Sequence, residues 1–479
     1  MKRFYQTLLL CLVIPLWTTA QVNVKTFTLD EAVQYALQNS VNSQNALLDE
    51  QIASAKVKET RGIGFPQISA SSSITHNTKL PRFFAAYNPK GGIINLGDAT
   101  YIKPGDVYAA QNFFQLQNSA DASVNVNQII FNGSYIVGLQ AANAYRELAK
   151  KQSDQTNEQI IQNVTKAYYT VMINRERIAL YDNNIARIDS LFRNTQALNK
   201  NGFAESIDVD RIQVTLTNLV TERDKFLNLN ELGIELLKFQ MNYPMADSIA
   251  VSGSLGDIQI ETNPAALEEA QYSARTDYRL LQANQKLQEL NLKNIRAAGL
   301  PSLSAFATFG YQTQSNTIGG LFKTNTDLSS APDSIKRAIG PDKWYNYSLV
   351  GIRLTIPLFS GFQQTYKVQQ QKLEIKKIEN NFRQMKSAID LETRQVQITY
   401  ANAIKSLQSQ KQNMDLASNI ARVTKIKYEQ GVGSNIEVIE AESSLKEAQT
   451  NYYNALYDVL NAKVDLDKAY GRLIPAPSK

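Results

Sequence analysis

Three segments of this chain occur twice, at a nearly constant separation, and this duplication limits the fold more than any other feature. The matching segments are 52–66 with 287–301, Phe131-Asn132-Gly133 with Phe359-Ser360-Gly361, and 201–209 with 430–438. Their offsets run from roughly 228 to 235 residues. Solenoid repeats span only about 20–50 residues. A duplication of this length therefore predicts two structurally equivalent halves.

Each half is predicted to contain a helix, two strands, a very long helix and a second long helix. The first repeat covers residues 21–244 and the second covers 265–479, with a linker at 245–264. The first repeat is expected to have helices at 28–62, 134–200 and 207–242 and strands at about 67–75 and 121–131. The second is expected to have helices at 265–298, 362–430 and 436–470 and strands at about 302–311 and 348–358.

Residues 1–20 have the pattern of a secretory signal peptide. Lys2 and Arg3 precede an apolar run from Leu8 to Trp17, and the small residues Thr18-Thr19-Ala20 follow it. The run is too short to span a bilayer as a helix, although a signal anchor is the competing interpretation. No later stretch approaches eighteen consecutive apolar residues, so we expect an exported chain that enters a membrane, if at all, as strands.

The composition argues against an enzyme. Cys11 is the only cysteine and lies in the predicted signal peptide, and His76, in a predicted loop, is the only histidine. Nucleophilic triads and thiolate metal sites therefore lack their side chains, and we expect no cofactor and no bound metal. Without Lys2 and Arg3, 48 basic residues face 44 acidic ones, which is too mild a balance to indicate nucleic-acid binding.

The predicted strands alternate apolar with polar or small residues. In 302–311 the apolar positions Leu303, Ala305, Ala307, Phe309 and Tyr311 alternate with polar, small and aromatic ones. Runs of about ten residues with this alternation are typical of outer-membrane barrels. A soluble hairpin with one face on a core gives the same alternation, and the strands alone do not separate the two.

The long helices are unusual for a globular protein. Residues 139–201 and 362–430 contain neither glycine nor proline, so each stretch predicts a helix of about 90–100 Å. Apolar residues repeat every seven positions in both halves. They are Val164, Val171, Ile178, Ile185 and Phe192 in one series, and Leu445, Tyr452, Val459 and Leu466 in the other. The pattern predicts a coiled-coil seam.

Four strands cannot close a barrel. Three chains would contribute about twelve strands, enough to surround a channel, and their helices would form a tube below it. Two chains would contribute eight strands, and side chains fill the interior of an eight-stranded barrel. The strand count therefore demands an oligomer, and a channel needs the homotrimer, whose strands would contact outer-membrane lipid.

The signal segment, the duplication, the Phe-Asn-Gly and Phe-Ser-Gly turns and the two glycine hairpins together resemble the TolC-like outer-membrane efflux protein family over essentially the whole mature chain. The resemblance implies a mostly α-helical fold with a membrane β-barrel: a trimeric twelve-stranded barrel that continues into a periplasmic α-helical coiled-coil tunnel. It implies the outer-membrane exit duct of a tripartite efflux pump or type I secretion system in a Gram-negative-type bacterium. The implied partners are a periplasmic adaptor protein and an inner-membrane transporter of the RND or ABC type.

The resemblance also implies roles for individual residues. A periplasmic gate falls on acids just after each hairpin, Asp208 in the first half and Glu437 and Glu440 in the second. Solvated acids at a helix start, favoured by the helix dipole, are the alternative. Adaptor contacts fall on the hairpins at Gly202, Phe203, Ala204, Gly431, Val432 and Gly433. The barrel-to-helix turns contain Phe131, Gly133, Phe359 and Gly361.

The runner-up interpretation is an exported coiled-coil scaffold or adhesin without a transport lumen. Such a scaffold would not need alternating strands of about ten residues in both halves.

Overall fold

A computed structural model describes residues 24–91, 94, 100–112, 114–255, 271–324 and 326–474. The predicted signal peptide, part of the predicted linker and the start of the helix expected at 265 lie outside the described residues. The chain divides into two compact units. Unit 1 comprises Met1–Ala53, Arg146–Gln285 and Lys376–Lys479, and unit 2 comprises Ser54–Tyr145 and Lys286–Ile375.

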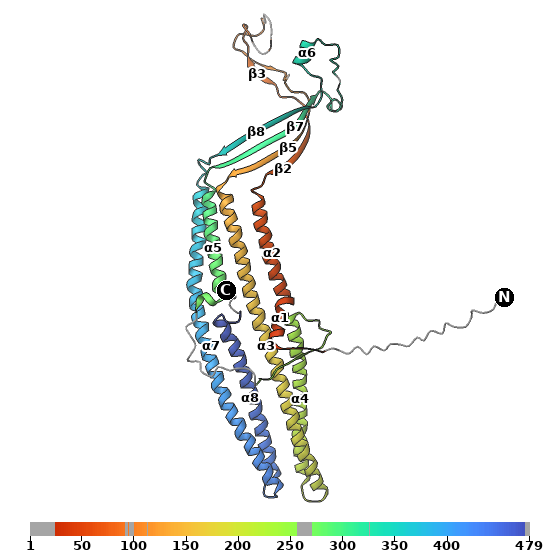
Figure 1. The fold of residues 1–479 in the computed structure, drawn as a ribbon, viewed down its shortest axis with the longest axis vertical. Coiled ribbons are helices and arrows are strands. Elements are labelled where there is room, and N and C mark those ends of the chain that lie inside the picture. The colour runs from red at the N-terminus through yellow and green to blue at the C-terminus, as the bar shows by residue number, and fades with distance from the viewer. Residues whose placement is uncertain are drawn as a thin grey trace, which may run out of the picture. The chain divides into compact units, whose positions relative to one another are not determined.

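Unit 2 contains an antiparallel sheet of four strands in the order β2-β5-β7-β8 (Figure 1). The strands are β2 (Gln67–His76), β5 (Asn118–Phe131), β7 (Ser302–Ser315) and β8 (Tyr345–Thr355). Each is thus contributed by one of the four predicted strand segments, and β5, β7 and β8 extend three or four residues further toward the connecting loops than expected. The expected end of the last strand at 358 was wrong. Pro357 has no N–H to donate to a ladder, and β8 ends before it.

The connections between the paired strands contain structure that the sequence did not suggest. A short antiparallel hairpin of β3 (Phe83–Ala86) and β4 (Val107–Ala110) lies between β2 and β5. Between β7 and β8 lie the 3-10 turn η4 (Gly319–Leu321) and the short helix α6 (Asp333–Ala338).

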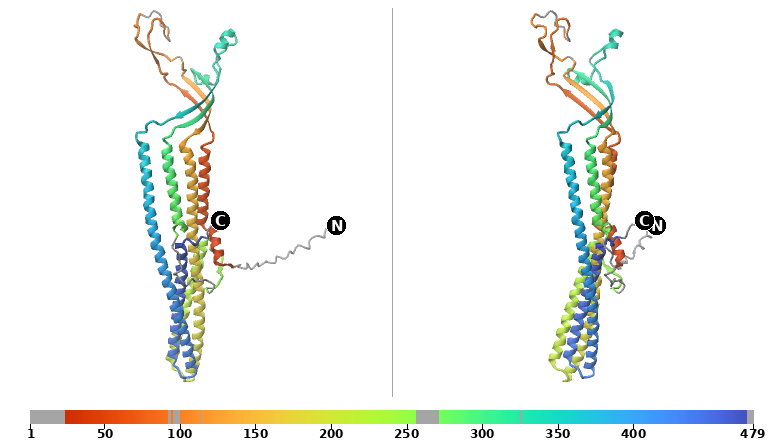
Figure 2. Two further views of the ribbon diagram at one scale, coloured as in Figure 1. Left: turned by 60° about the vertical axis from the view of Figure 1, so that its left-hand side comes forward. Right: turned by 90° about the vertical axis from the view of Figure 1, so that its left-hand side faces the viewer.

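Four long helices supply most of unit 1, and they form two hairpins. Helix α3 (Gly133–Lys200) turns into α4 (Ser206–Met241), and α7 (Gln363–Glu429) turns into α8 (Asn435–Ala469) (Figures 1 and 2). Their ends differ from the expected ones by one residue. Within the described residues, no helix combines the length and the apolar character that crossing a bilayer would require.

The heptad seam is confirmed. Val164 and Val171 of α3 are fully or almost fully buried, and Ile178, Ile185 and Phe192 pack with residues of α4. In α8, Leu445, Val459 and Leu466 are buried, and Ala455, Ala462 and Ala469 between them are buried as well. Small side chains at these positions allow helices to approach closely. Helix α8 accordingly packs against α3 and also against α7.

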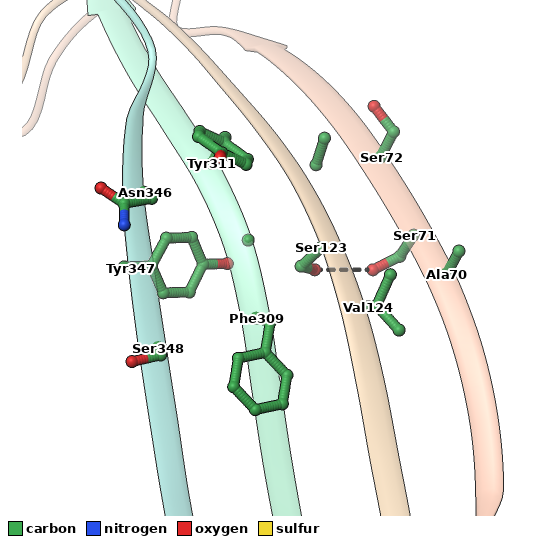
Figure 3. Close-up of a pocket in the computed structure, with 12 residues that line it drawn as sticks. Ala70, Ser71, Ser72, Ser123, Val124, Phe309, Tyr311, Asn346, Tyr347 and Ser348 are labelled. Carbon is green, nitrogen blue, oxygen red and sulfur yellow. Dashed lines mark hydrogen bonds between the residues drawn. The ribbon is translucent and has the colours of Figure 1, made fainter.

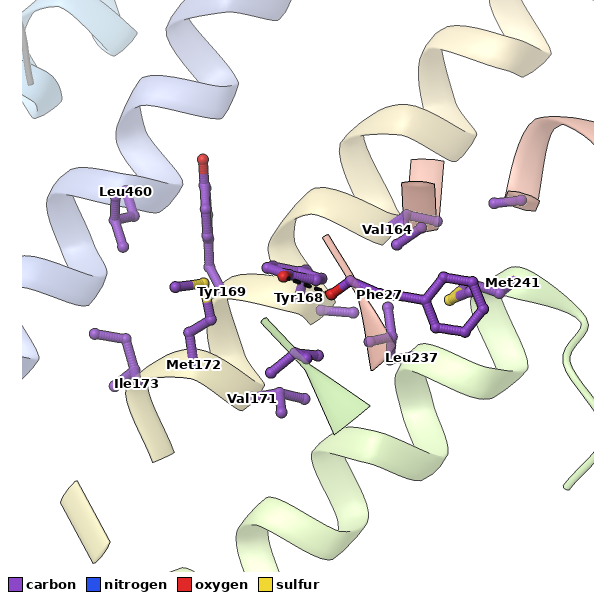
Figure 4. Packing of buried hydrophobic residues seen from close by; sticks show 14 of the residues in the cluster. Phe27, Val164, Tyr168, Tyr169, Val171, Met172, Ile173, Leu237, Met241 and Leu460 are labelled. Atoms are coloured by element: carbon purple, nitrogen blue, oxygen red, sulfur yellow. Dashed lines mark hydrogen bonds between the residues drawn. The ribbon is translucent and has the colours of Figure 1, made fainter. Parts of the chain in front are cut away.

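The largest core of unit 1 surrounds α3 where the chain enters the first repeat (Figure 4). Strand β1 (Lys25–Phe27) pairs in parallel with β6 (Ile249–Val251), which lies in the predicted linker. Phe27 of β1 is 2% exposed and packs with residues of α3 and α4. The paired strands β1 and β6 therefore hold the start of the first repeat and the segment that follows it against the same hydrophobic core.

The first predicted helix, 28–62, is two helices, so the expectation of one was wrong. The capping box at Thr28 and Glu31 is confirmed, and α1 runs from Leu29 to Asn39. Ser40 then adopts an extended conformation, with φ −62° and ψ 141°, before α2 (Val41–Gly62) begins. The Ser40 hydroxyl accepts a hydrogen bond from the Ser43 N–H, so a side chain replaces the helical ladder at this break.

The corresponding helix of the second repeat begins later than residue 265 in the described chain. A 3-10 turn at Tyr272–Ala274 precedes α5, which spans Thr276–Ala297. Arg275 between them has φ −74° and ψ 137°, which interrupts helical geometry at that residue.

Candidate functional site

One face of the four-stranded sheet is lined mainly by polar side chains. Residues that pair directly across strands share a face, and the register places serines, asparagines and an aspartate together. The members on β2 and β5 are Gln67, Ser69, Ser71, Ser73, Asp121, Ser123, Asn125 and Asn127. The members on β7 and β8 are Ser304, Phe306, Thr308, Gly310, Gln312, Tyr345, Tyr347, Leu349, Gly351 and Arg353. We call this set the polar face.

Hydrogen bonds connect the polar face across all four strands. The Tyr347 hydroxyl donates to Asp121 Oδ2 at 2.5 Å, and the Ser123 hydroxyl donates to Asp121 Oδ1 at 3.4 Å. Ser123 and Ser71 lie 3.2 Å apart through their hydroxyls (Figure 3). Asn125 donates to Ser71 at 3.3 Å. Asn125 also accepts from the Thr308 hydroxyl at 2.8 Å.

Two aromatic rings lie across neighbouring strands on this face. A Cβ added at Gly310 would meet Tyr347 Cε1 at 2.9 Å, so the ring passes over that glycine to reach Asp121. A Cβ at Gly351 would meet Phe306 Cζ at 2.7 Å. The two glycines thus make room for rings that lie against the sheet.

The opposite face of the sheet is mainly apolar and largely exposed, although Ser72, Asn346 and Ser348 also lie on it. Its large side chains include Ile68, Val124, Phe309, Val350, Ile352 and Leu354, with exposures between 42% and 75%. Soluble monomers seldom expose a continuous apolar surface of this kind, so this face requires an apolar environment.

His76 does not lie in a loop as predicted, although its side chain is exposed. It is the last residue of β2, and its Nδ1 lies 2.8 Å from Asn118 Oδ1 on β5. The strand continues further than the weak serine-rich pattern of 67–75 suggested, which brings the histidine into the sheet.

The two strand-to-helix turns differ although their sequences match. Phe131 ends β5, the Asn132 side chain accepts a hydrogen bond from the Tyr135 N–H at 3.0 Å, and α3 begins at Gly133. A Cβ at Gly133 would lie 3.0 Å from Leu300 Cδ1, so this glycine permits close packing.

In the second turn, Phe359 lies four residues beyond the end of β8 and is 77% exposed. Gly361 and Phe362 both have positive φ, at 59° and 62°. Only glycine adopts that conformation without steric cost, so the second turn carries strain at Phe362 that the first lacks.

The two helical hairpins have the same backbone geometry. Gly202 and Gly431 have φ of 78° and 76°, and their N–H groups donate to the carbonyls of Asn199 and Tyr428, each at 3.0 Å. The next residues, Phe203 and Val432, donate to Leu198 and Lys427 at 2.9 and 3.0 Å. Their side chains are 81% and 78% exposed. Each turn therefore presents one large apolar side chain, while Ala204 is half-buried.

Gly433 lies close to the end of α7. A Cβ there would lie 3.0 Å from the Tyr428 backbone nitrogen and 3.1 Å from Lys427 Cβ. A side chain at 433 would press on the end of α7, whereas a Cβ at Gly202 would meet nothing within 4 Å.

The predicted gate acids all lie in the first two turns of α4 and α8, and Glu437 and Glu440 line one groove to which Asp208 does not contribute. Asp208 is half-buried, and its Oδ1 lies 3.5 Å from Arg211 NH1. Glu437 and Glu440 are exposed. Among the described residues, neither has an ion-pair partner within 4.0 Å.

Two grooves border Glu440. One, of about 430 Å³, lies between α4 and α8 and is lined by Ile207, Asp210, Arg211, Val214, Thr215, Ile436, Ile439 and Glu440. The other, of about 410 Å³, lies between α7 and α8 and includes Glu437, Leu416 and Ile420. Asp208 lines neither groove.

Arg211 is the tip residue that sequence reasoning missed. The offset of 229 residues that pairs Asp208 with Glu437 also pairs Arg211 with Glu440. Both members of that second pair line the groove between α4 and α8. Extending the repeat alignment by three residues would have found this opposite charge.

No group of three or more His, Cys, Asp or Glu side chains in the described part of the chain has a spacing that could hold a metal ion.

Sequence comparison identifies related proteins. The profile of the outer membrane efflux protein family matches residues 32–229 and 273–472, one segment in each repeat. The outer membrane protein TolC of Vibrio cholerae is 22% identical over 358 residues, which cover 74% of this chain and 76% of that protein. The toluene efflux pump outer membrane protein TtgC of Pseudomonas putida is 21% identical over 317 residues, or 65% of this chain and 60% of that protein.

Solved structures share the fold at low sequence identity. The outer membrane channel CmeC of Campylobacter jejuni aligns with a TM-score of 0.67 and 16% identity, covering 94% of this chain and 87% of that chain. The open-state MtrE outer membrane channel of Neisseria gonorrhoeae aligns with a TM-score of 0.67 and 16% identity, covering 92% and 88%. With the family profile matched in both repeats, the chain belongs to the outer membrane efflux protein family.

Proposed function

We propose that the protein is the outer-membrane exit duct of a tripartite efflux pump or type I secretion system, a passive water-filled channel. The observation that carries this proposal is the two-faced sheet, with a hydrogen-bonded polar face and an exposed apolar face. In a closed barrel the polar face would line water and the apolar face would meet lipid. Purified protein should produce stepwise single-channel currents in planar lipid bilayers. The absence of such currents would contradict the proposal that the protein is a channel.

The channel would be assembled from three copies. Strands β2 and β8 are the edges of the four-stranded sheet, and an edge strand left open in a membrane has unpaired backbone groups. Pairing β8 of one copy with β2 of the next gives twelve strands in a trimer. Mass measurement in mild detergent should find three chains per particle. A stable monomer would rule out this assembly.

Asp208, Glu437 and Glu440 are proposed to close the periplasmic tip. Three copies would gather the exposed Glu437 and Glu440 of each chain around one axis, where like charges attract cations and resist close approach. Replacing both glutamates by alanine should raise single-channel conductance and weaken block by trivalent cations. Unchanged conductance and block would assign these acids to solvated surface instead.

The hairpins are proposed to meet a periplasmic adaptor protein, which would connect the duct to an inner-membrane transporter of the RND or ABC type. Phe203 and Val432 are the exposed apolar side chains there, and neither is needed by the turn hydrogen bonds, which are made by backbone groups. Phe203→Asp and Val432→Asp should therefore abolish export while the yield of trimer stays normal.

Gly433→Asp is a poorer probe, because any side chain at 433 would disturb the end of α7. A photo-crosslinker at position 432 should capture the adaptor. Crosslinks confined to neighbouring copies of this chain, with normal export by both variants, would reject the site.

A further inference from the structure

Arg177 on α3 is a cation without a carboxylate partner. Its NH1 lies 3.5 Å from Asn174 Oδ1, a second terminal nitrogen donates to Asn454 Oδ1, and its guanidinium lies 5.3 Å from the Phe226 ring centroid. No carboxylate oxygen of the described residues lies within 4.0 Å of the Arg177 guanidinium nitrogens, the limit for an ion pair. Its Nε is buried and has no hydrogen-bond acceptor among the described residues.

The surroundings make this arrangement unusual. Burial lowers the pKa of Arg177, whereas Tyr457, Tyr181 and Asp458 act in the opposite direction, Asp458 from beyond ion-pair distance. A guanidinium nevertheless stays charged at neutral pH. Two other arginines of unit 1 do pair with acids, Arg187 with Glu442 at 3.0 Å and Arg275 with Asp277 at 2.8 Å. Arg279, like Arg177, has a buried Nε without an acceptor among the described residues.

Arg177 borders a groove of about 280 Å³ between α3, α4 and α8. The lining residues that matter for binding are Thr170, Asn174, Arg177, Leu232, Leu236 and Tyr457. Its polar groups lie on α3 and α8, where the Thr170 and Tyr457 hydroxyls are 3.3 Å apart. Its apolar wall is α4, where Leu232 and Leu236 are 65% and 45% exposed.

We propose that this groove binds a small amphipathic carboxylate, with its anionic group on Arg177 and its apolar part against the leucines of α4. A carboxylate would accept the hydrogen bond that Nε does not make within the described chain. It would also place a negative charge beside the guanidinium, which the neutral amides of Asn174 and Asn454 cannot do. Few polar groups on a mainly apolar wall are the usual composition of a small-molecule site. The site lies in the helical unit and does not depend on the proposed channel activity.

The test uses the full-length protein in lipid nanodiscs with 4-fluorobenzoate as the probe, followed by fluorine NMR. We expect saturable binding of 4-fluorobenzoate. Binding of 4-fluorobenzyl alcohol, which lacks the charge, and of 4-fluorobenzylamine, which reverses it, should be at least tenfold weaker. Equal binding of the alcohol would overturn the assignment of a carboxylate.

Arg177→Met should lower the affinity for 4-fluorobenzoate tenfold or more, because it removes hydrogen bonds to a charged group. Arg193→Met is the matched control, since Arg193 is exposed on the same helix and pairs with Asp189 at 2.8 Å. Equal binding by the two variants, or no saturable binding by the wild type, would refute the proposal.

A second variant covers the case in which Arg177→Met folds poorly. Leu236→Glu places a carboxylate of the chain itself in the groove at a partly exposed position. It should abolish 4-fluorobenzoate binding while trimer yield stays normal. Unchanged probe affinity in this variant would show that the groove is not where the carboxylate binds.

Discussion

The two repeats share a backbone plan, but the contacts that stabilise the segments near their starts differ in chemistry. At the start of the first repeat, Phe27 packs edge-on against Tyr35 and Tyr243, at centroid distances of 5.6 and 5.7 Å. At the start of the second, the buried Arg275 pairs with Asp277 and Glu392, each at 2.8 Å. We call these places the aromatic node and the charged node. The offset of 235 residues that matches 52–66 with 287–301 pairs Arg275 with Ser40 and not with Phe27, so the two nodes lie at different positions of the duplicated unit.

The two hairpin tips have the same backbone geometry but different charged side chains. Gly202 and Gly431 keep one turn geometry, yet Asp208 and Arg211 of the first half correspond to Glu437 and Glu440 of the second. The backbone at a tight turn restricts the residue type, because positive φ favours glycine. The side chains on the next helical turn are free of that restriction, so the charges can differ.

The largest expected effect is at the charged node. Arg275→Met removes the ion pairs with Asp277 and Glu392 and leaves Asp277 uncompensated near the buried Glu158, so the free energy of unfolding should fall by about 3 kcal/mol. Chemical denaturation of the detergent-solubilised protein measures this loss. Arg193→Met is the exposed control, and a loss no greater than the control's would show that the node does not stabilise the fold.

A smaller loss is expected at the aromatic node. The Tyr168 hydroxyl lies 2.9 Å from the Phe27 carbonyl oxygen and 2.5 Å from that of Ser252, and its one proton serves one carbonyl at a time (Figure 4). Tyr168→Phe should therefore cost about 1–2 kcal/mol in the same denaturation experiment. A loss larger than that of Arg275→Met would reverse the ranking of the two nodes.

The charged node should also respond to pH. Burial raises the pKa of Glu158, although the Thr276 hydroxyl, Lys468 and Arg275 oppose the rise and Asp277 adds to it. The folded state therefore holds the proton more tightly than the unfolded chain. The stability that this proton supplies is fully present below the unfolded pKa of about 4.5 and is lost as pH rises through the folded pKa.

Glu158→Gln should therefore reduce the fall in melting temperature between pH 4.5 and pH 7.5. Glu147→Gln on the same helix, whose side chain is 58% exposed, should leave that difference as it is in the wild type. The same pH profile in the Glu158 variant and the wild type would mean that this carboxyl does not contribute to the pH response.

The smallest effect on stability, and a specific one on conduction, is expected at the tip. Arg211→Glu gives the first half the same acidic pair as the second, and because Arg211 is partly exposed its stability should change by only about 0.5 kcal/mol. Block of single-channel current by a trivalent cation should become stronger. If block by the trivalent cation were unchanged, position 211 of α4 would not belong to the proposed gate.

The sequence predicted the elements whose patterns are repeated and local. The absence of glycine and proline predicted α3 and α7 to within one residue, and the alternation located all four strands. The break at Ser40 could not be seen, because it depends on a side-chain hydrogen bond within an otherwise helical composition. The pairing of β1 with β6 joins residues more than two hundred positions apart, and three-residue strands have no periodicity to detect.

The candidate site was predicted less completely than the fold. The hairpin glycines were found because a backbone position with positive φ favours glycine. The close approach of Gly433 to α7 depends on the three-dimensional packing of the turn, which the sequence does not display. The ring of Tyr347 over Gly310 depends on cross-strand register, and the chain separates these residues by a long loop.

The central claim is that the polar face of the sheet lines a water-filled channel, and Thr308 and Phe309 test it most directly. They are neighbours on β7 whose side chains lie on opposite faces, and Cys11 in the predicted signal peptide is the only cysteine of the sequence. Thr308→Cys and Phe309→Cys would be treated with a charged, membrane-impermeant thiol reagent during single-channel recording in a bilayer. We predict that the reagent modifies the Thr308 variant and lowers its conductance but leaves the Phe309 variant unchanged. Modification of both variants alike, or of the Phe309 variant alone, would contradict the claim.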